Sequence, residues 1–151
     1  MKGLFLSLLC LALLADPVEG QITLVWSGVY TEALGGQWGG DVRLGIEPPL
    51  SPVGVFGGAD YFATECPDHC GLWGWRVGGT VRSTTPGLQP FLTGAFLVRE
   101  LEEGDTAAKN EGLSLGAGLR LSLGFVIQGE VTREFLGEPL DHWVFRVGIG
   151  F

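Results

Sequence analysis

The chain has 151 residues, enough for one domain, and its 17 acidic against nine basic side chains give a formal net charge of −8. That balance excludes the basic surface that nucleic-acid binding needs, so no nucleic-acid partner is expected. The composition is 46% hydrophobic with 26 glycines and five tryptophans. After residue 20 the only lysine is Lys109, whereas a soluble β-protein usually covers its surface with lysine and glutamate.

Residues 1–20 have the pattern of a secretory signal peptide. Lys2 precedes an apolar run of about a dozen residues, which is too short to span a bilayer as a helix but typical of a signal sequence. Cleavage is expected after Gly20, with cleavage after Ala15 as the alternative. The mature chain is then a single domain, residues 21–151.

Beyond residue 20, apolar and polar residues alternate with a period of two, which predicts β-strands with one apolar and one polar face. Most of them have about the length that a tilted strand needs to cross a membrane. The predicted strands cover residues 21–32, 37–47, 53–64, 72–82, 88–99, 112–121, 125–135 and 140–151. Residues 100–111, rich in carboxylates, are predicted to be the longest irregular connection.

The strand at 53–64 has two open face assignments. Placing Val55 and Tyr61 on the apolar outer face puts Asp60 inside, but it also turns Phe56 and Phe62 inward. A β-bulge would switch the parity within the strand.

The last predicted strand, LDHWVFRVGIGF, ends the sequence on an aromatic residue with apolar residues alternating behind it. It resembles the closing strand of a bacterial outer-membrane β-barrel, in which such residues form the signal read by the barrel-assembly machinery. In this chain the corresponding residues are Phe145, Val147, Ile149 and Phe151. The hairpin GLSLGAGLRLSLGFVIQGEVTREF adds a glycine-alternating strand, a short turn and a strand with an inward glutamate. Over residues 21–151 the chain therefore resembles the small eight-stranded outer-membrane barrels of the OmpA transmembrane-domain and OmpX type.

This resemblance implies an all-β fold, an eight-stranded antiparallel up-and-down transmembrane β-barrel whose first and last strands pair. It also implies location in the bacterial outer membrane, contact with outer-membrane lipid and lipopolysaccharide, and a monomer with a non-enzymatic structural or surface-interaction role. The chain is expected to depart from some members in lacking long protruding strands or loops. An eight-stranded barrel is filled by its own side chains, so a general diffusion pore is not expected.

The polar face carries charges of both signs in near balance, which predicts a packed ionic barrel interior, because buried charges need partners. The predicted interior charges are Asp41, Arg43, Glu47, Asp60, Arg76, Arg82, Arg120, Glu130, Glu134 and Arg146. Glu130 is expected to bridge Arg120 and Arg146 on the flanking strands. One alternative places the charges in water at the two rims. Another is a soluble secreted barrel whose apolar face lines a ligand cavity.

No catalytic, cofactor-binding or metal-binding residue is predicted. Cys66 and Cys70, in ECPDHC, are expected to form a disulfide in the exported protein, with a metal site that includes His69 as the less favoured reading. His142 raises the alternative of a lipid-modifying barrel enzyme, but no His-x-Ser motif supports it.

Two further groups of residues are expected to mark the barrel surface. The five tryptophans should lie on the exterior and in the aromatic girdles; they are Trp26, Trp38, Trp73, Trp75 and Trp143. The acidic loops are expected to be solvated, with divalent cations that bridge lipopolysaccharide phosphates as the alternative. Their carboxylates are Glu100, Glu102, Glu103, Asp105, Glu138 and Asp141.

Overall fold

The computed structural model describes residues 21–48, 51–63, 70–103, 106–123, 125–137 and 141–151, so the predicted signal peptide lies outside the described residues. The elements are β1 (Gln21–Thr31), η1 (Ala33–Gly35), β2 (Gln37–Glu47), β3 (Val53–Ala63), β4 (Cys70–Arg82), β5 (Leu88–Glu103), β6 (Thr106–Ser122), β7 (Val126–Phe135) and β8 (His142–Gly150). No helix within these ranges is long and apolar enough to cross a bilayer.

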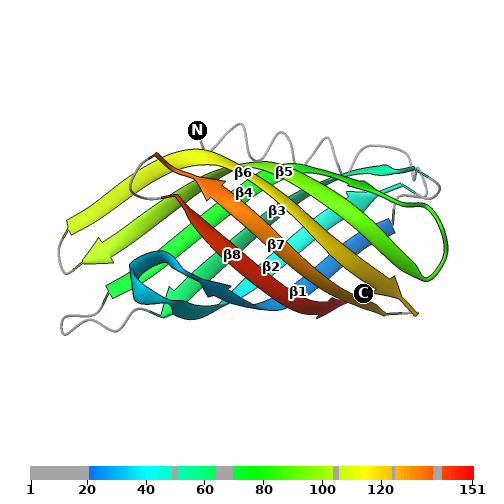
Figure 1. The fold of residues 1–151 in the computed structure, drawn as a ribbon, viewed down its shortest axis with the longest axis horizontal. Helices are drawn as coiled ribbons and strands as arrows, with labels where there is room; N and C mark the ends of the chain where they lie inside the picture. Colours follow the sequence, from blue (N-terminus) through cyan, green and yellow to red (C-terminus); the bar gives the residue numbers. More distant parts are fainter. Residues whose placement is uncertain (1–20, 49–50, 64–69, 104–105, 124, 138–140) are drawn as a thin grey trace.

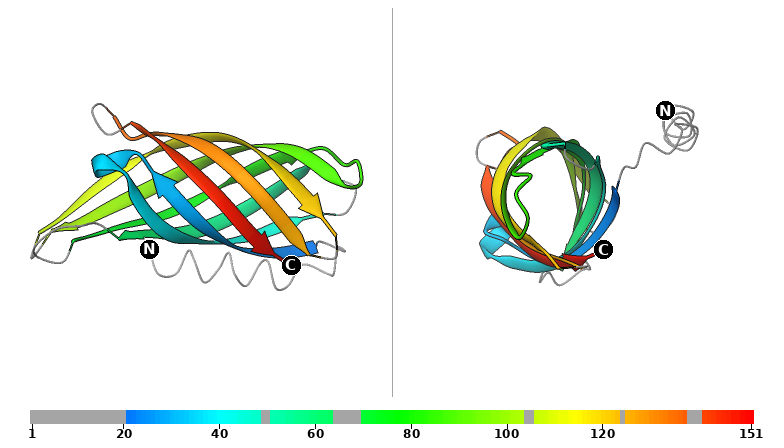
Figure 2. Two further views of the ribbon diagram at one scale, coloured as in Figure 1. Left: turned by 60° about the horizontal axis from the view of Figure 1, so that its bottom comes forward. Right: turned by 90° about the vertical axis from the view of Figure 1, so that its right-hand side faces the viewer.

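The strands form one closed barrel in which each strand pairs antiparallel with its neighbours, in the order β1 to β8. β8 closes the barrel against β1, from Gly150 opposite Val25 to Val144 opposite Thr31. The strands cross the barrel axis at a steep tilt (Figure 1), and the end-on view shows the ring that they close (Figure 2). Closure pairs both edges of the sheet. The predicted eight-stranded antiparallel barrel, with its first and last strands paired, is confirmed.

Most of the bulky apolar side chains point outward, away from the barrel interior. Exposed fractions run from 38% for Tyr61 to 72% for Trp38, and all five tryptophans are on the outer wall. The burial patterns of β2 and β8 alternate strictly along much of their length, with polar or small residues on the buried positions. A soluble barrel requires the opposite arrangement, with the apolar face inside, so that alternative is wrong. An apolar outer wall is the arrangement that lipid requires.

The side chains of β3 alternate between the two faces without a break, which decides between the two face assignments for this strand. Its pairing with β4 is uninterrupted from Val53 to Ala63, so no bulge switches its faces. Asp60 therefore points inward, together with Phe56 and Phe62, which are 4% and 0% exposed. The interior accommodates both rings because guanidinium groups cover them. The Arg43 Cζ lies 3.8 Å from the centroid of Phe56, and the Arg99 Cζ lies 5.1 Å from that of Phe62.

The acidic stretch 100–111 is not the irregular connection that the sequence predicted. β5 and β6 stay paired up to Glu103 opposite Thr106, whereas the pairing of β6 with β7 begins only at Leu113. The β5–β6 hairpin thus extends beyond β7 at one end of the barrel (Figure 1, left), and the expected lack of protruding strands is also wrong. We call this end the hairpin end, and the end where β1 begins and β8 finishes the terminal end.

An apolar cluster fills the interior near the hairpin end. Val29, Phe62 and Val144 are fully buried there, Leu72 is 6% exposed, and Leu101 packs against them. These side chains come from β1, β3, β8, β4 and β5, so the cluster joins opposite sides of the wall. Asp60 and Arg146 each lie two residues from a member of this cluster on the same strand, on the side toward the terminal end.

Candidate functional site

The barrel interior is the candidate site, and its first part is an ion-pair group next to the apolar cluster. Arg99 on β5 pairs with Asp60 and donates to Glu134, with an Nη2–Oε1 distance of 2.6 Å. The Arg146 Nη2 lies 3.1 Å from Asp60 Oδ2 and 3.2 Å from Glu134 Oε1. Each arginine thus contacts both carboxylates. Gly74 provides the room, because a Cβ there would overlap the Arg99 guanidinium and the Asp60 carboxylate.

A second group lies nearer the middle of the barrel. The Arg76 Nη2 donates to Asp41 Oδ1 at 2.8 Å, and its Nη1 lies 3.7 Å from Glu130 Oε2. Arg43 Nη1 lies 3.4 Å from the same Glu130 oxygen. The Nε of Arg146 is 3.8 Å from Asp41, which connects this group to the first one. The four strands β2, β4, β7 and β8 are therefore tied together through the interior.

A third, smaller group lies near the terminal end. Glu47 is the carboxylate here, opposite Gln21 in the first pair of β1 with β2. Its Oε2 accepts from Arg120 and lies 3.1 Å from Arg82 Nη1. A cavity of about 10 Å³ borders these three side chains, enough for about one water molecule.

The predicted interior charges all point into the barrel, and the partner predicted for one of them is wrong. Glu130 lies opposite Arg146 in the β7–β8 register. Among the described residues, however, its ion-pair partners are Arg43 and Arg76 on β2 and β4, while Arg120 pairs with Glu47. The barrel is narrow enough for a glutamate to reach strands across it. The reading that places these charges in water at the rims is wrong, because nearly all are under 6% exposed.

Arg99 is the interior residue that the predicted set lacked. It is 3% exposed and holds Asp60 and Glu134 together. Alternation along β5 already places the Arg99 side chain on the polar face with Thr93. Following that alternation to the end of the strand therefore identifies Arg99 as an interior residue. The predicted strand ended at Arg99, and the predicted irregular stretch began at the next residue, Glu100.

His142 opens β8 and lies inside the barrel. It is 7% exposed, and its Nε2 is 3.2 Å from Glu134 Oε2. The neighbouring Trp143 points outward and is 41% exposed. His142 is thus held by an interior carboxylate on the face opposite to lipid.

The cysteine prediction lies outside the described residues. Cys66 falls in the segment 64–69, and Cys70 begins β4 with a side chain that the structure does not describe. The disulfide therefore stays a prediction. Within the described ranges, no group of three or more His, Cys, Asp or Glu side chains could hold a metal ion.

The outer wall carries two features of interest beyond the predicted ones. Phe145, Val147, Ile149 and Phe151 all face outward, at 39% to 69% exposure, and their role as an assembly signal stays a prediction. Arg133 on β7 also faces outward, between Leu115 and Trp143 in the register of the sheet. It was not assigned to a face from the sequence.

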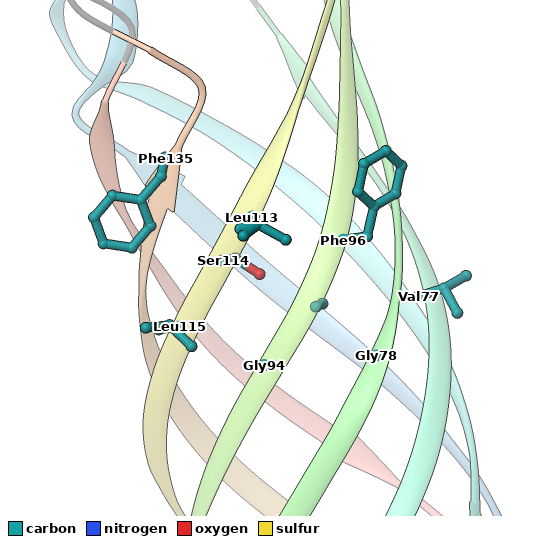
Figure 3. A pocket seen from close by; sticks show the side chains of 9 residues that line it. Val77, Gly78, Gly94, Phe96, Leu113, Ser114, Leu115 and Phe135 are labelled. Carbon is teal, nitrogen blue, oxygen red and sulfur yellow. The ribbon is translucent and has the colours of Figure 1, made fainter.

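An apolar groove of about 420 Å³ crosses the outer wall over β4 to β7. Figure 3 shows side chains from these strands around Gly94. Because glycine has no side chain, the space over Gly94 is left open. The groove is lined by Val77, Gly78, Gly94, Ala95, Phe96, Leu113, Ser114, Leu115 and Phe135.

No family model matches the chain, and no curated protein sequence matches it. Solved structures do. The N-terminal β-barrel domain of Pseudomonas aeruginosa OprF has a TM-score of 0.57 and 17% identity, over 87% of this chain and 98% of that one. Ail of Yersinia pestis has a TM-score of 0.59 and 12% identity, over 87% and 95%. Neisserial surface protein A has a TM-score of 0.61 and 10% identity, over 85% and 92%.

Identities this low show a common fold. All three structures are small barrels, and this chain covers more than nine-tenths of each. The chain therefore has the fold of the small eight-stranded outer-membrane β-barrels of the OmpA and OmpX type.

Proposed function

We propose that the protein is a non-enzymatic β-barrel of the bacterial outer membrane with a structural or surface-interaction role. Its fold and its apolar outer wall support this location, as does the signal peptide predicted for residues 1–20. The observation that carries the proposal is the connected ion-pair network in the interior. It fills the lumen with arginine and carboxylate side chains from strands on all sides.

A filled lumen favours a structural role over transport. Arg146 lies across the barrel from β8 toward Asp60 on β3, and the apolar cluster lies between this pair and the hairpin end. A hydrated ion that passes through would have to displace both. Charges that are paired and buried resist displacement, because removing one partner leaves the other uncompensated.

Ion conductance tests the closed interior. The protein reconstituted in a planar lipid bilayer is expected to show no resolved channel openings. A variant with Arg146→Ala, Glu134→Ala and Phe62→Ala lacks two long charged side chains and the ring of the apolar cluster, and it is expected to conduct, once its heat-modifiable mobility on a gel shows that it has folded. Regular open-channel steps in the unaltered protein would contradict the closed interior.

The surroundings of His142 favour a non-enzymatic role. A histidine that acts as general base on a lipid must reach a nucleophile at a lipid-accessible position. His142 instead faces the lumen and contacts Glu134. Mass spectra of lipid A and phospholipids are expected to be identical from cells with and without the protein. A modified lipid species that depends on the protein, and that His142→Ala abolishes, would refute this part of the proposal.

A further inference from the structure

We propose that Arg133 and the apolar groove beside it bind one lipopolysaccharide molecule, with a lipid A phosphate on the guanidinium and an acyl chain in the groove. The inference rests on the outer-membrane location proposed above. It goes further by assigning a lipid site to particular residues of the outer wall.

The groove has the size and chemistry for an acyl chain. Val77 and Phe96 border it on one side, Leu113, Leu115 and Phe135 on the other, and Gly94 leaves its floor open. A methylene group is similar in size to a water molecule, which takes about 30 Å³ in the liquid, so 420 Å³ accommodates on the order of ten such groups. Both borders are apolar and lie on the lipid-facing wall.

Arg133 is a cation on an otherwise apolar part of this wall. Its outward neighbours along β7 are Val131 and Phe135, and Leu115 and Trp143 lie opposite it on β6 and β8. Its Cζ lies 5.4 Å from the Trp143 ring centroid, a cation–π contact. Among the described residues, no carboxylate lies within ion-pair distance of Arg133, whereas the exposed Lys109 on β6 pairs with Glu111 at 3.3 Å.

A cation that faces hydrocarbon needs an anionic partner, and the lipid headgroups supply one. Arginine binds phosphate through two parallel N–H donors, which makes phosphate a preferred partner. Two residues that border the groove are neighbours of Arg133. Leu115 lies opposite it on β6, and Phe135 is the next outward-facing residue on β7. A lipid with its phosphate on Arg133 can therefore place a chain in the groove.

The position along the barrel selects the lipid. Phe135 is the last residue of β7 and pairs with Leu113, so the site lies near the hairpin end. The ring pairs Tyr30–Trp38 and Tyr61–Trp73 lie at the same end, as expected for an interfacial girdle. In an outer-membrane barrel the longer connections face the exterior. The lipid at that level is then lipopolysaccharide. Its lipid A part carries phosphate groups as well as several acyl chains.

Native mass spectrometry of the protein extracted from membranes in mild detergent, titrated with lipid A, tests the site. One bound lipid A is expected. Arg133→Gln removes the charge and keeps the length, and the loss of a charge-assisted hydrogen bond should weaken binding roughly tenfold. Gly94→Leu should weaken it similarly by filling the groove. A Cβ at Gly94 meets only Leu115 Cδ2, at 3.6 Å, so the barrel tolerates this change.

Gly28→Leu is the matched control. Gly28 faces outward on β1, away from the groove, and a Cβ there meets nothing within 4 Å, so lipid A binding should be unchanged. Dephosphorylated lipid A should bind the unaltered protein as weakly as lipid A binds Arg133→Gln. Equal binding by the unaltered protein, Arg133→Gln and Gly94→Leu would overturn the site, and equal affinity for phosphatidylglycerol would overturn the assignment to lipopolysaccharide. Neither result would affect the conductance or lipid-mass experiments, which test the proposed function.

Discussion

The two halves of the lumen are built differently. In the hairpin half, Arg99 and Arg146 each contact both Asp60 and Glu134, so every charge has at least two partners. In the terminal half, one carboxylate, Glu47, serves two arginines. The hairpin half is also covered by the apolar cluster, whereas a small cavity adjoins Glu47. We infer that the side chains of the hairpin half, and not those of the terminal half, close the lumen.

The difference has an energetic consequence. The side chain of Glu134 is 1% exposed, and the two guanidinium groups beside it are 4% and 1% exposed, so water cannot replace a lost partner. The Arg82 side chain beside Glu47 is 11% exposed, and the cavity there can admit a water molecule. The same chemical change should therefore cost more in the hairpin half than in the terminal half.

Glu134→Gln is expected to have the largest effect on stability. Glutamine keeps the shape of the side chain but removes the charge that Arg99 and Arg146 share. Breaking a buried ion pair by neutralising one partner costs about 3 kcal/mol, the lower end of the usual range, because the amide oxygen still accepts a hydrogen bond. Urea unfolding in detergent micelles, followed by tryptophan fluorescence, measures the loss.

Glu111→Gln is the control for that experiment. Glu111 pairs with Lys109 on the protruding hairpin, where the two side chains are 57% and 48% exposed. Exposed ion pairs contribute little, so the free energy of unfolding should remain within the error of the measurement. If Glu134→Gln were no more destabilising than this control, the hairpin-half network would not stabilise the barrel.

Alternation predicted the wall of this barrel well. A period of two places each side chain on one of two faces, and lipid and the lumen impose opposite requirements on those faces, so residues such as Trp143 and Arg146 could be placed from the sequence. The pattern did not identify the strands within residues 100–111, because their charges indicated a loop although the backbone continues as a hairpin.

Ion-pair partners could not be predicted in the same way. Alternation gives the face of Glu130 but not the direction in which its side chain extends across a narrow lumen, and it reaches Arg43 and Arg76 instead of the adjacent strands. Partner choice depends on tilt, register and the length of every side chain at that level. Arg133 was missed for a different reason, since it is a charge on the apolar face and contradicts the pattern that locates the others.

Glu47→Gln is the smallest change expected to be measurable, and it tests the comparison most directly. It removes the carboxylate that Arg82 and Arg120 share, as Glu134→Gln does for two arginines in the other half. Because water can reach Arg82 through the terminal end, the loss should be about 1.5 kcal/mol, the value for a hydrogen bond to a charged group. The two variants unfolded side by side should differ in urea midpoint, with Glu134→Gln the lower. Equal midpoints would mean that burial and the number of partners do not separate the two halves, and the reverse order would place the closure of the barrel at the terminal end.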